Sequence, residues 1–177
     1  MAARLQTMRI LWMALFGSSV MFLFMITSHV VHDEHARMPP HLPEMLGALA
    51  FGISIVSIAL PARGFDMALR TMKVTFENEV GEPVGSFRES APVEKLFASP
   101  HQTVMDAFTR FQTPFLIGMA LSESICLFGF MLGFMNAPPT TYAPFFAVGL
   151  GLMAWKFPRL STITSALERV KGAKLKF

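Results

Sequence analysis

Charged side chains and cysteines are scarce in this chain. Asp, Glu, Lys and Arg make up 15% of the 177 residues, whereas soluble domains carry about 25%. The single cysteine, Cys126, lies in an apolar run, so a disulfide framework is excluded. We find no nucleotide-binding loop, CxxC pair or nucleophile triad, so no soluble-type enzyme active site is predicted. Because 53% of the residues are hydrophobic, we expect a single integral membrane domain.

Four apolar runs are candidates for transmembrane helices, since a helix needs roughly 20 residues to cross the hydrocarbon. They cover about residues 10–31, 45–62, 111–136 and 139–155. Residues 63–110, between the second and third runs, carry apolar side chains at helical spacing, which predicts a helical loop. Residues 156–177 are predicted to form a basic amphipathic tail. The expected fold is all-α, with four spans.

The positions of the basic residues predict the orientation. Fourteen of the fifteen Lys and Arg residues lie before the first run, in the 63–110 loop or after the fourth run, and only Arg37 lies elsewhere. Basic residues collect on the cytoplasmic side, so both termini and the loop are expected there, in the cell inner (cytoplasmic) membrane. Attraction to anionic lipid headgroups explains the net charge of +3 without a nucleic-acid partner.

The two halves of the chain resemble each other. At an offset of 106, residues 4–25 match residues 110–131 with ten identities in 22 positions, beginning with Arg-x-Gln-Thr in both copies. The second and fourth runs correspond at an offset of 97. This pattern indicates a duplication. The expected architecture is two helical hairpins related as parallel repeats.

Small residues recur on one face of two runs. Lipid gives no hydrophobic drive between helices, so close approach through small residues holds membrane bundles together. Packing within one chain already explains these stripes, which also permit contacts between copies of the chain. The predicted packing positions are Gly118, Ser122, Cys126, Gly129 and Gly133 on the third run and Ala50, Ser54 and Ser57 on the second.

Glu123 is the candidate functional residue. About twelve uncharged residues lie on either side of it in the third run, which puts it near the middle of the bilayer. An ionised carboxylate there costs on the order of 2.5 to 3.5 kcal/mol, so we expect it to be protonated unless a cation or donor is near. A carboxyl of this kind suits proton carriage or cation binding, with Ser122 and Ser124 as neighbouring ligands. The alternative is a hydrogen bond that only joins two helices.

The residues around Glu123 resemble a known family. The stretch FLIGMALSESICLFGF, residues 115–130, is similar to the carboxylate-bearing helix of the ring-forming proteolipid (c) subunits of rotary ATP synthases and ATPases. The resemblance covers about 25 residues well and implies that Glu123 is the ion-binding carboxylate. The chain departs from the family in its long loop and in its expected cytoplasmic termini. In the first repeat, Gly17 also takes the place of the carboxyl. No Gln or Glu lies on the second run to complete a sodium site, so protons are expected.

A histidine cluster follows the first run. His29, His32 and His35 are spaced as metal or haem ligands could be, with acidic neighbours. A short polar loop at the membrane surface explains the same residues, and it is the preferred interpretation, with no cofactor.

These patterns leave three hypotheses. The leading one is a proteolipid-like subunit, not itself an enzyme, that binds or carries a proton at Glu123 within a homo-oligomer or a larger membrane complex. The second is a non-catalytic structural or assembly subunit of such a complex. The third is a redox subunit that uses the His29, His32 and His35 cluster.

Overall fold

The computed structural model of the chain describes residues 2–28, 39–79 and 94–175. In this part the chain folds into five helices and one two-stranded ribbon. The helices are α1 (Ala2–Thr27), α2 (Leu42–Arg70), α3 (Pro100–Phe134), α4 (Pro139–Trp155) and α5 (Leu160–Lys171). The all-α prediction is confirmed in its main features.

Three of these helices, α1, α2 and α3, are long and apolar enough to cross a membrane. Each begins before the apolar run from which it was predicted, and α3 begins at Pro100, directly after its N-cap residue Ser99. Helix α4 has 17 residues and coincides with the fourth predicted run. A fourth span and the side of the membrane on which the termini lie stay predictions.

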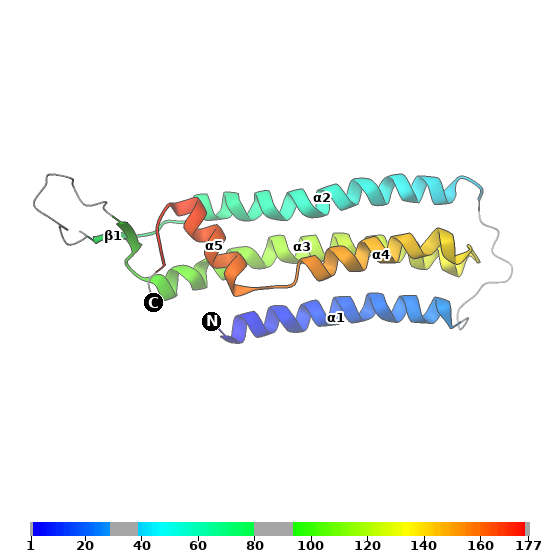
Figure 1. Cartoon of the computed structure of the whole chain (residues 1–177), viewed down its shortest axis with the longest axis horizontal. Coiled ribbons are helices and arrows are strands. Elements are labelled where there is room, and N and C mark those ends of the chain that lie inside the picture. Colours follow the sequence, from blue (N-terminus) through cyan, green and yellow to red (C-terminus); the bar gives the residue numbers. More distant parts are fainter. Residues whose placement is uncertain (1, 29–38, 80–93, 176–177) are drawn as a thin grey trace, which may run out of the picture.

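Helix α3 is the central element of the bundle. It packs against α1, α2, α4 and α5, and Figure 1 shows α1 and α2 on opposite sides of the α3–α4 pair. The end that holds the starts of α1 and α3 and the last residues of α2 is called the terminal end below. Helices α1 and α3 run away from this end, whereas α2 and α4 run back toward it.

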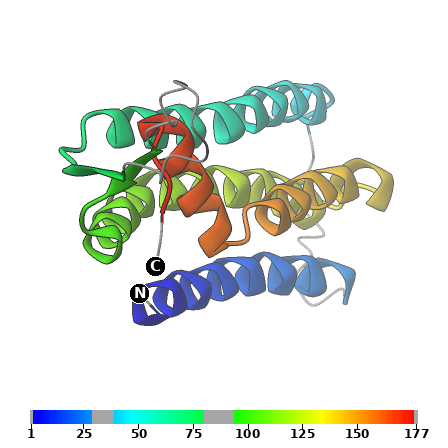
Figure 2. The same ribbon diagram turned by 60° about the vertical axis from the view of Figure 1, so that its left-hand side comes forward.

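The structure corrects the expectation of two equivalent hairpins. Helices α3 and α4 pack together as an antiparallel hairpin, but α1 and α2 are held apart because α3 lies between them, as Figure 2 also shows. The helix directions agree with parallel repeats, but the packing of the two halves differs. The duplication stays a prediction.

In the described part of the predicted loop (residues 63–79 and 94–110), residues 63–70 and 100–110 are helical. Strands β1 (Phe76–Glu79) and β2 (Glu94–Phe97) pair antiparallel, with Phe76 opposite Phe97. The rings of this pair lie 5.7 Å apart between centroids, and such cross-strand aromatic pairs stabilise short ribbons. The prediction of a helical loop is therefore confirmed for residues 63–70 and 100–110 and wrong for the two strands.

Helix α5 closes the terminal end. Its apolar face buries Ile163, Ala166 and Leu167, and the helix packs against α2 and α3. The Arg169 guanidinium lies 3.1 Å from the Asp66 carboxylate, and Lys171 donates to the backbone oxygen of Met72 at 2.6 Å. The predicted basic amphipathic tail thus packs its apolar face on the bundle in this structure.

The α3–α4 hairpin depends on a glycine. A β-carbon at Gly149 would touch the Cys126 sulfur and would lie 2.9 Å from the backbone oxygen of Ser122. Backbone atoms of α3 cannot yield as a flexible side chain does. By contrast, a β-carbon at Gly151, on the outer face of α4, would meet nothing within 4 Å.

We therefore expect Gly149→Ala to lower the free energy of unfolding by about 1–3 kcal/mol, the usual cost of overpacking. Gly151→Ala is the matched control in the same helix, and it should leave stability unchanged or raise it by up to about 1 kcal/mol through helix propensity. Unfolding in mixed detergent micelles measures both. Equal stability of the two variants would contradict this packing.

Candidate functional site

Glu123 forms a bridge from α3 to α1. Its Oε1 atom and the Ser18 Oγ atom are 2.8 Å apart, which is a hydrogen-bonding distance. The same Ser18 hydroxyl lies 2.8 Å from the backbone oxygen of Leu15, one turn earlier in α1. The Glu123 side chain is half-buried, so the carboxyl lies against α1 rather than fully open to the surroundings of the bundle.

The serines on either side of Glu123 point elsewhere. Successive residues of a helix are about 100° apart, so three in a row cannot share one face. Ser122 is fully buried and faces α2 and α4, whereas the Ser124 hydroxyl donates to the backbone oxygen of Ala120 in its own helix. The structure does not bring Ser122, Glu123 and Ser124 together as one ligand set.

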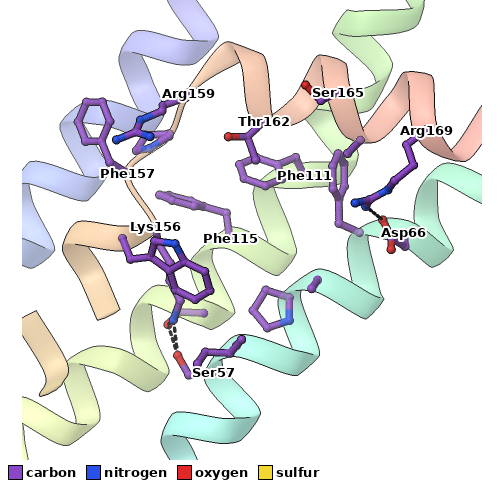
Figure 3. A pocket seen from close by; sticks show the side chains of 18 residues that line it. Ser57, Asp66, Phe111, Phe115, Lys156, Phe157, Arg159, Thr162, Ser165 and Arg169 are labelled. Atoms are coloured by element: carbon purple, nitrogen blue, oxygen red, sulfur yellow. Dashed lines mark hydrogen bonds and ion pairs between the residues drawn. The ribbon is translucent and has the colours of Figure 1, made fainter. Parts of the chain in front are cut away.

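A second polar cluster lies on a different face of α3 from this bridge, toward α2 and the end of α4. The Lys156 ammonium donates to the Ser122 Oγ at 2.7 Å and to the Gly118 backbone oxygen at 2.8 Å. It also donates to the Ser57 hydroxyl of α2, as the dashed line in Figure 3 shows. The two serine hydroxyls are 3.0 Å apart. All three ammonium protons therefore have neutral oxygen acceptors.

The charge of Lys156 has no counter-ion in the described part of the chain, where the ion pairs are His41–Glu44 and Arg169–Asp66. Lysines at the ends of membrane helices usually extend toward the surface. Lys156, directly after α4, instead points back along the bundle, toward Ser57 and Ser122. A cation held in this way is costly to bury, and such residues mark functional sites in membrane proteins.

Sequence reasoning missed this role of Lys156, which was assigned to the basic tail. One signal was available: the fourth run is short, so its C-terminal lysine falls within reach of the bundle interior. The partner serine, Ser57, was predicted only as a packing position. No sequence pattern links Ser57, Ser122 and Lys156, because they lie on three different helices or their ends.

A cavity of about 560 Å³ opens next to the ammonium. Helix α2, helix α3, the link after α4 and helix α5 form its walls, as Figure 3 shows. The cavity extends from Ser57 and Gly118 at its inner end to Asp66 and Arg169 at its outer end. Its aromatic wall includes Phe111 and Phe115 of α3.

The predicted small residues of α3 approach three different helices. A β-carbon at Gly118 would lie 2.8 Å from Pro61 of α2, and one at Gly129 would lie 2.9 Å from Phe146 of α4. At Gly133 it would meet Ile26 of α1 at 2.6 Å. Cys126 is fully buried. The small residues of α3, which were predicted to form one packing seam, thus make close contacts with α1, α2 and α4.

The second helix has the same kind of contact. Ala50 and Ser57 are buried, and Ser57 reaches Ser122 across the interface. The Ser54 hydroxyl instead donates to the backbone oxygen of Ala50 in its own helix.

The histidine cluster lies outside the described residues, since His29, His32 and His35 belong to residues 29–38. His41 is described, and its Nδ1 atom lies 3.7 Å from the Glu44 carboxylate. The described ranges contain no group of three His, Cys, Asp or Glu side chains placed to hold a metal ion.

In comparisons with known proteins, no family model, curated protein or solved structure matches this chain.

The Lys156 cluster yields a double-mutant test. Ser57→Ala removes one acceptor from a buried ammonium, so we expect the free energy of unfolding to fall by about 1–3 kcal/mol. In a Lys156→Met background, Ser57→Ala should lower the free energy of unfolding clearly less, because no ammonium is left that needs the serine as an acceptor. Unfolding of the four proteins in detergent micelles measures the coupling.

Ser54→Ala is the control, one turn away on the same helix. Its hydroxyl bonds only within α2, so its effect should be small and independent of residue 156. A Ser57→Ala effect of equal size with Lys or Met at position 156 would show that the ammonium is not held by this serine.

Proposed function

We propose that this chain is a proteolipid-like membrane subunit that binds a proton at Glu123. The observation that carries the proposal is the pair of contacts at Ser18. One oxygen, Ser18 Oγ, lies 2.8 Å from both the Glu123 carboxyl and the Leu15 carbonyl. Each of the two contacts has a hydrogen of its own only if Glu123 supplies the second one.

A serine hydroxyl supplies one hydrogen and two acceptor lone pairs. If Glu123 is ionised, Ser18 must share its single hydrogen between two acceptors. If Glu123 is protonated, its O–H donates to Ser18 Oγ and Ser18 donates to Leu15, so both contacts are satisfied. One bound proton therefore completes the hydrogen-bond network between α1 and α3.

The surroundings favour the same state. Apolar helices give a carboxylate little solvation, and a neutral acid is cheaper to hold near the middle of a bilayer. The local resemblance of residues 115–130 to proteolipid subunits supports ion binding at Glu123, and the lack of Gln or Glu on the second run (residues 45–62) supports a proton over sodium. In this reading the chain works as part of a homo-oligomer or a larger membrane complex, in the cytoplasmic membrane.

A structural subunit is the second candidate, and the same Ser18–Glu123 contact favours it. A neutral acid that donates to Ser18 joins α1 to α3 even if the proton never leaves. The two functions differ in whether the proton exchanges, which can be measured.

We expect dicyclohexylcarbodiimide, which is soluble in lipid and reacts with protonated carboxyls, to modify Glu123 in native membranes. The reaction should slow as the pH rises, since ionised Glu123 is unreactive. Mass spectrometry of the peptide that spans residues 111–134 measures the rate. Ser18→Ala should slow the reaction at a given pH, because the protonated acid loses the acceptor that stabilises it.

Glu123→Gln tests the same site without removing the bridge, because an amide can still donate to Ser18. This variant should assemble normally and lose the modification, whereas Glu44→Gln, at an exposed position, should keep it. An unmodified Glu123 at every pH, in a protein that assembles, would overturn proton exchange and leave the structural role.

A further inference from the structure

We infer that the cavity beside Lys156 binds an anionic phospholipid, with the lipid phosphate between Lys156 and Arg159 and an acyl chain along its aromatic wall. This site lies on a different face of α3 from Glu123 and does not depend on the proposed proton binding.

The charges that line the cavity are unbalanced. Lys156, Arg159 and Arg169 contribute three positive charges, and Asp66 contributes one negative charge. Asp66 is already paired with Arg169 at 3.1 Å. Two cations therefore remain without a counter-ion in the described part of the chain. Their charges would attract an anion into the cavity.

The donors at the cavity wall are available. Within the described residues, neither the Arg159 guanidinium nor the Thr162 hydroxyl makes a hydrogen bond, although both line the cavity (Figure 3). Guanidinium groups pair with phosphate through two parallel hydrogen bonds. Lys156 can reach the same anion by rotating its flexible stem away from Ser57, which would relieve the cost of holding an unpaired charge among neutral oxygens.

The rest of the wall suits a hydrocarbon chain. Phe111, Phe115 and Pro61 line the interior, and the cavity also includes two outward-facing apolar residues, Ile58 at 42% and Trp155 at 68% exposure. These residues belong to α2 and α4, on the surface that lipid covers in a membrane protein. A small water-soluble anion would contact only the cationic side chains. A phospholipid would contact them through its phosphate and the apolar wall through an acyl chain.

The location also fits a lipid. The outer part of the cavity lies toward the terminal end of the bundle, where the basic residues collect and where α5 packs across α2 and α3. The distribution of Lys and Arg predicts that this end faces the cytoplasm, and clusters of basic residues at that surface select anionic headgroups.

Tryptophan fluorescence can test the site, because the chain has only two tryptophans. In a Trp12→Phe background, Trp155 reports on its own surroundings. The protein is placed in phosphatidylcholine vesicles with a minor share of brominated phosphatidylglycerol or, in parallel, of brominated phosphatidylcholine. Bromine on the acyl chain quenches a nearby indole, so we expect stronger quenching by the brominated anionic lipid.

Lys156→Met and Arg159→Gln should each lower the preference for the anionic lipid about fivefold, as expected for one basic side chain near the surface. Arg63→Gln is the matched control, since Arg63 is an exposed basic residue at the same end of α2 that does not line the cavity. It should keep the preference. Native mass spectrometry of the unmodified protein should show the bound phosphatidylglycerol directly.

Three results would overturn the proposal. Equal quenching by the two brominated lipids would show no selection. If Arg63→Gln lowered the preference for the anionic lipid as much as Lys156→Met and Arg159→Gln do, the attraction would come from the basic surface as a whole and not from the cavity. Displacement of the lipid by inorganic phosphate at similar concentrations would show a site for a small anion. Glu123→Gln should leave the lipid preference intact, so failure here is separable from failure of proton binding.

Discussion

Polar groups inside a helix bundle in lipid have little water to bind, and this determines the contacts of α3. Each buried polar group must find its partner on another helix or in its own backbone. Two adjacent residues of α3 meet this requirement on different faces of the helix: Glu123 pairs with Ser18 of α1, and Ser122 pairs with Ser57 of α2 and with Lys156. These contacts explain why α3 is central and why α1 and α2 lie on opposite sides of it.

Much of this arrangement follows from local sequence. The apolar runs predicted the helices that α1, α2, α3 and α4 form, because hydrocarbon length and helical rise fix the number of residues that a span needs. Glu123 was identifiable because a lone acid in a long apolar run has few explanations. The spacing of Gly118, Gly129 and Gly133 predicted that other helices approach α3 closely at these residues. The structure shows a different neighbouring helix at each of the three glycines.

Other features depend on long-range packing that no local pattern encodes. The helices have similar apolar surfaces, so these surfaces alone do not determine that α3 lies between α1 and α2. The direction of the Lys156 side chain depends on where α4 ends relative to Ser57 and Ser122. The β1–β2 ribbon comes from short segments around Phe76 and Phe97, which carry too few residues for a clear alternation. Residues 29–38 lie outside the described part, so the histidine hypothesis stays a prediction.

We propose that Glu123 is a neutral acid that exchanges its proton while it bridges α1 and α3. Solid-state NMR of the protein in lipid bilayers, with ¹³C-labelled Glu and Glu123→Gln to assign the signal, measures the carboxyl shift of this residue directly. We predict the shift of a protonated acid at neutral pH and a reversible change to that of a carboxylate as the pH rises. A carboxylate shift at neutral pH would contradict the claim.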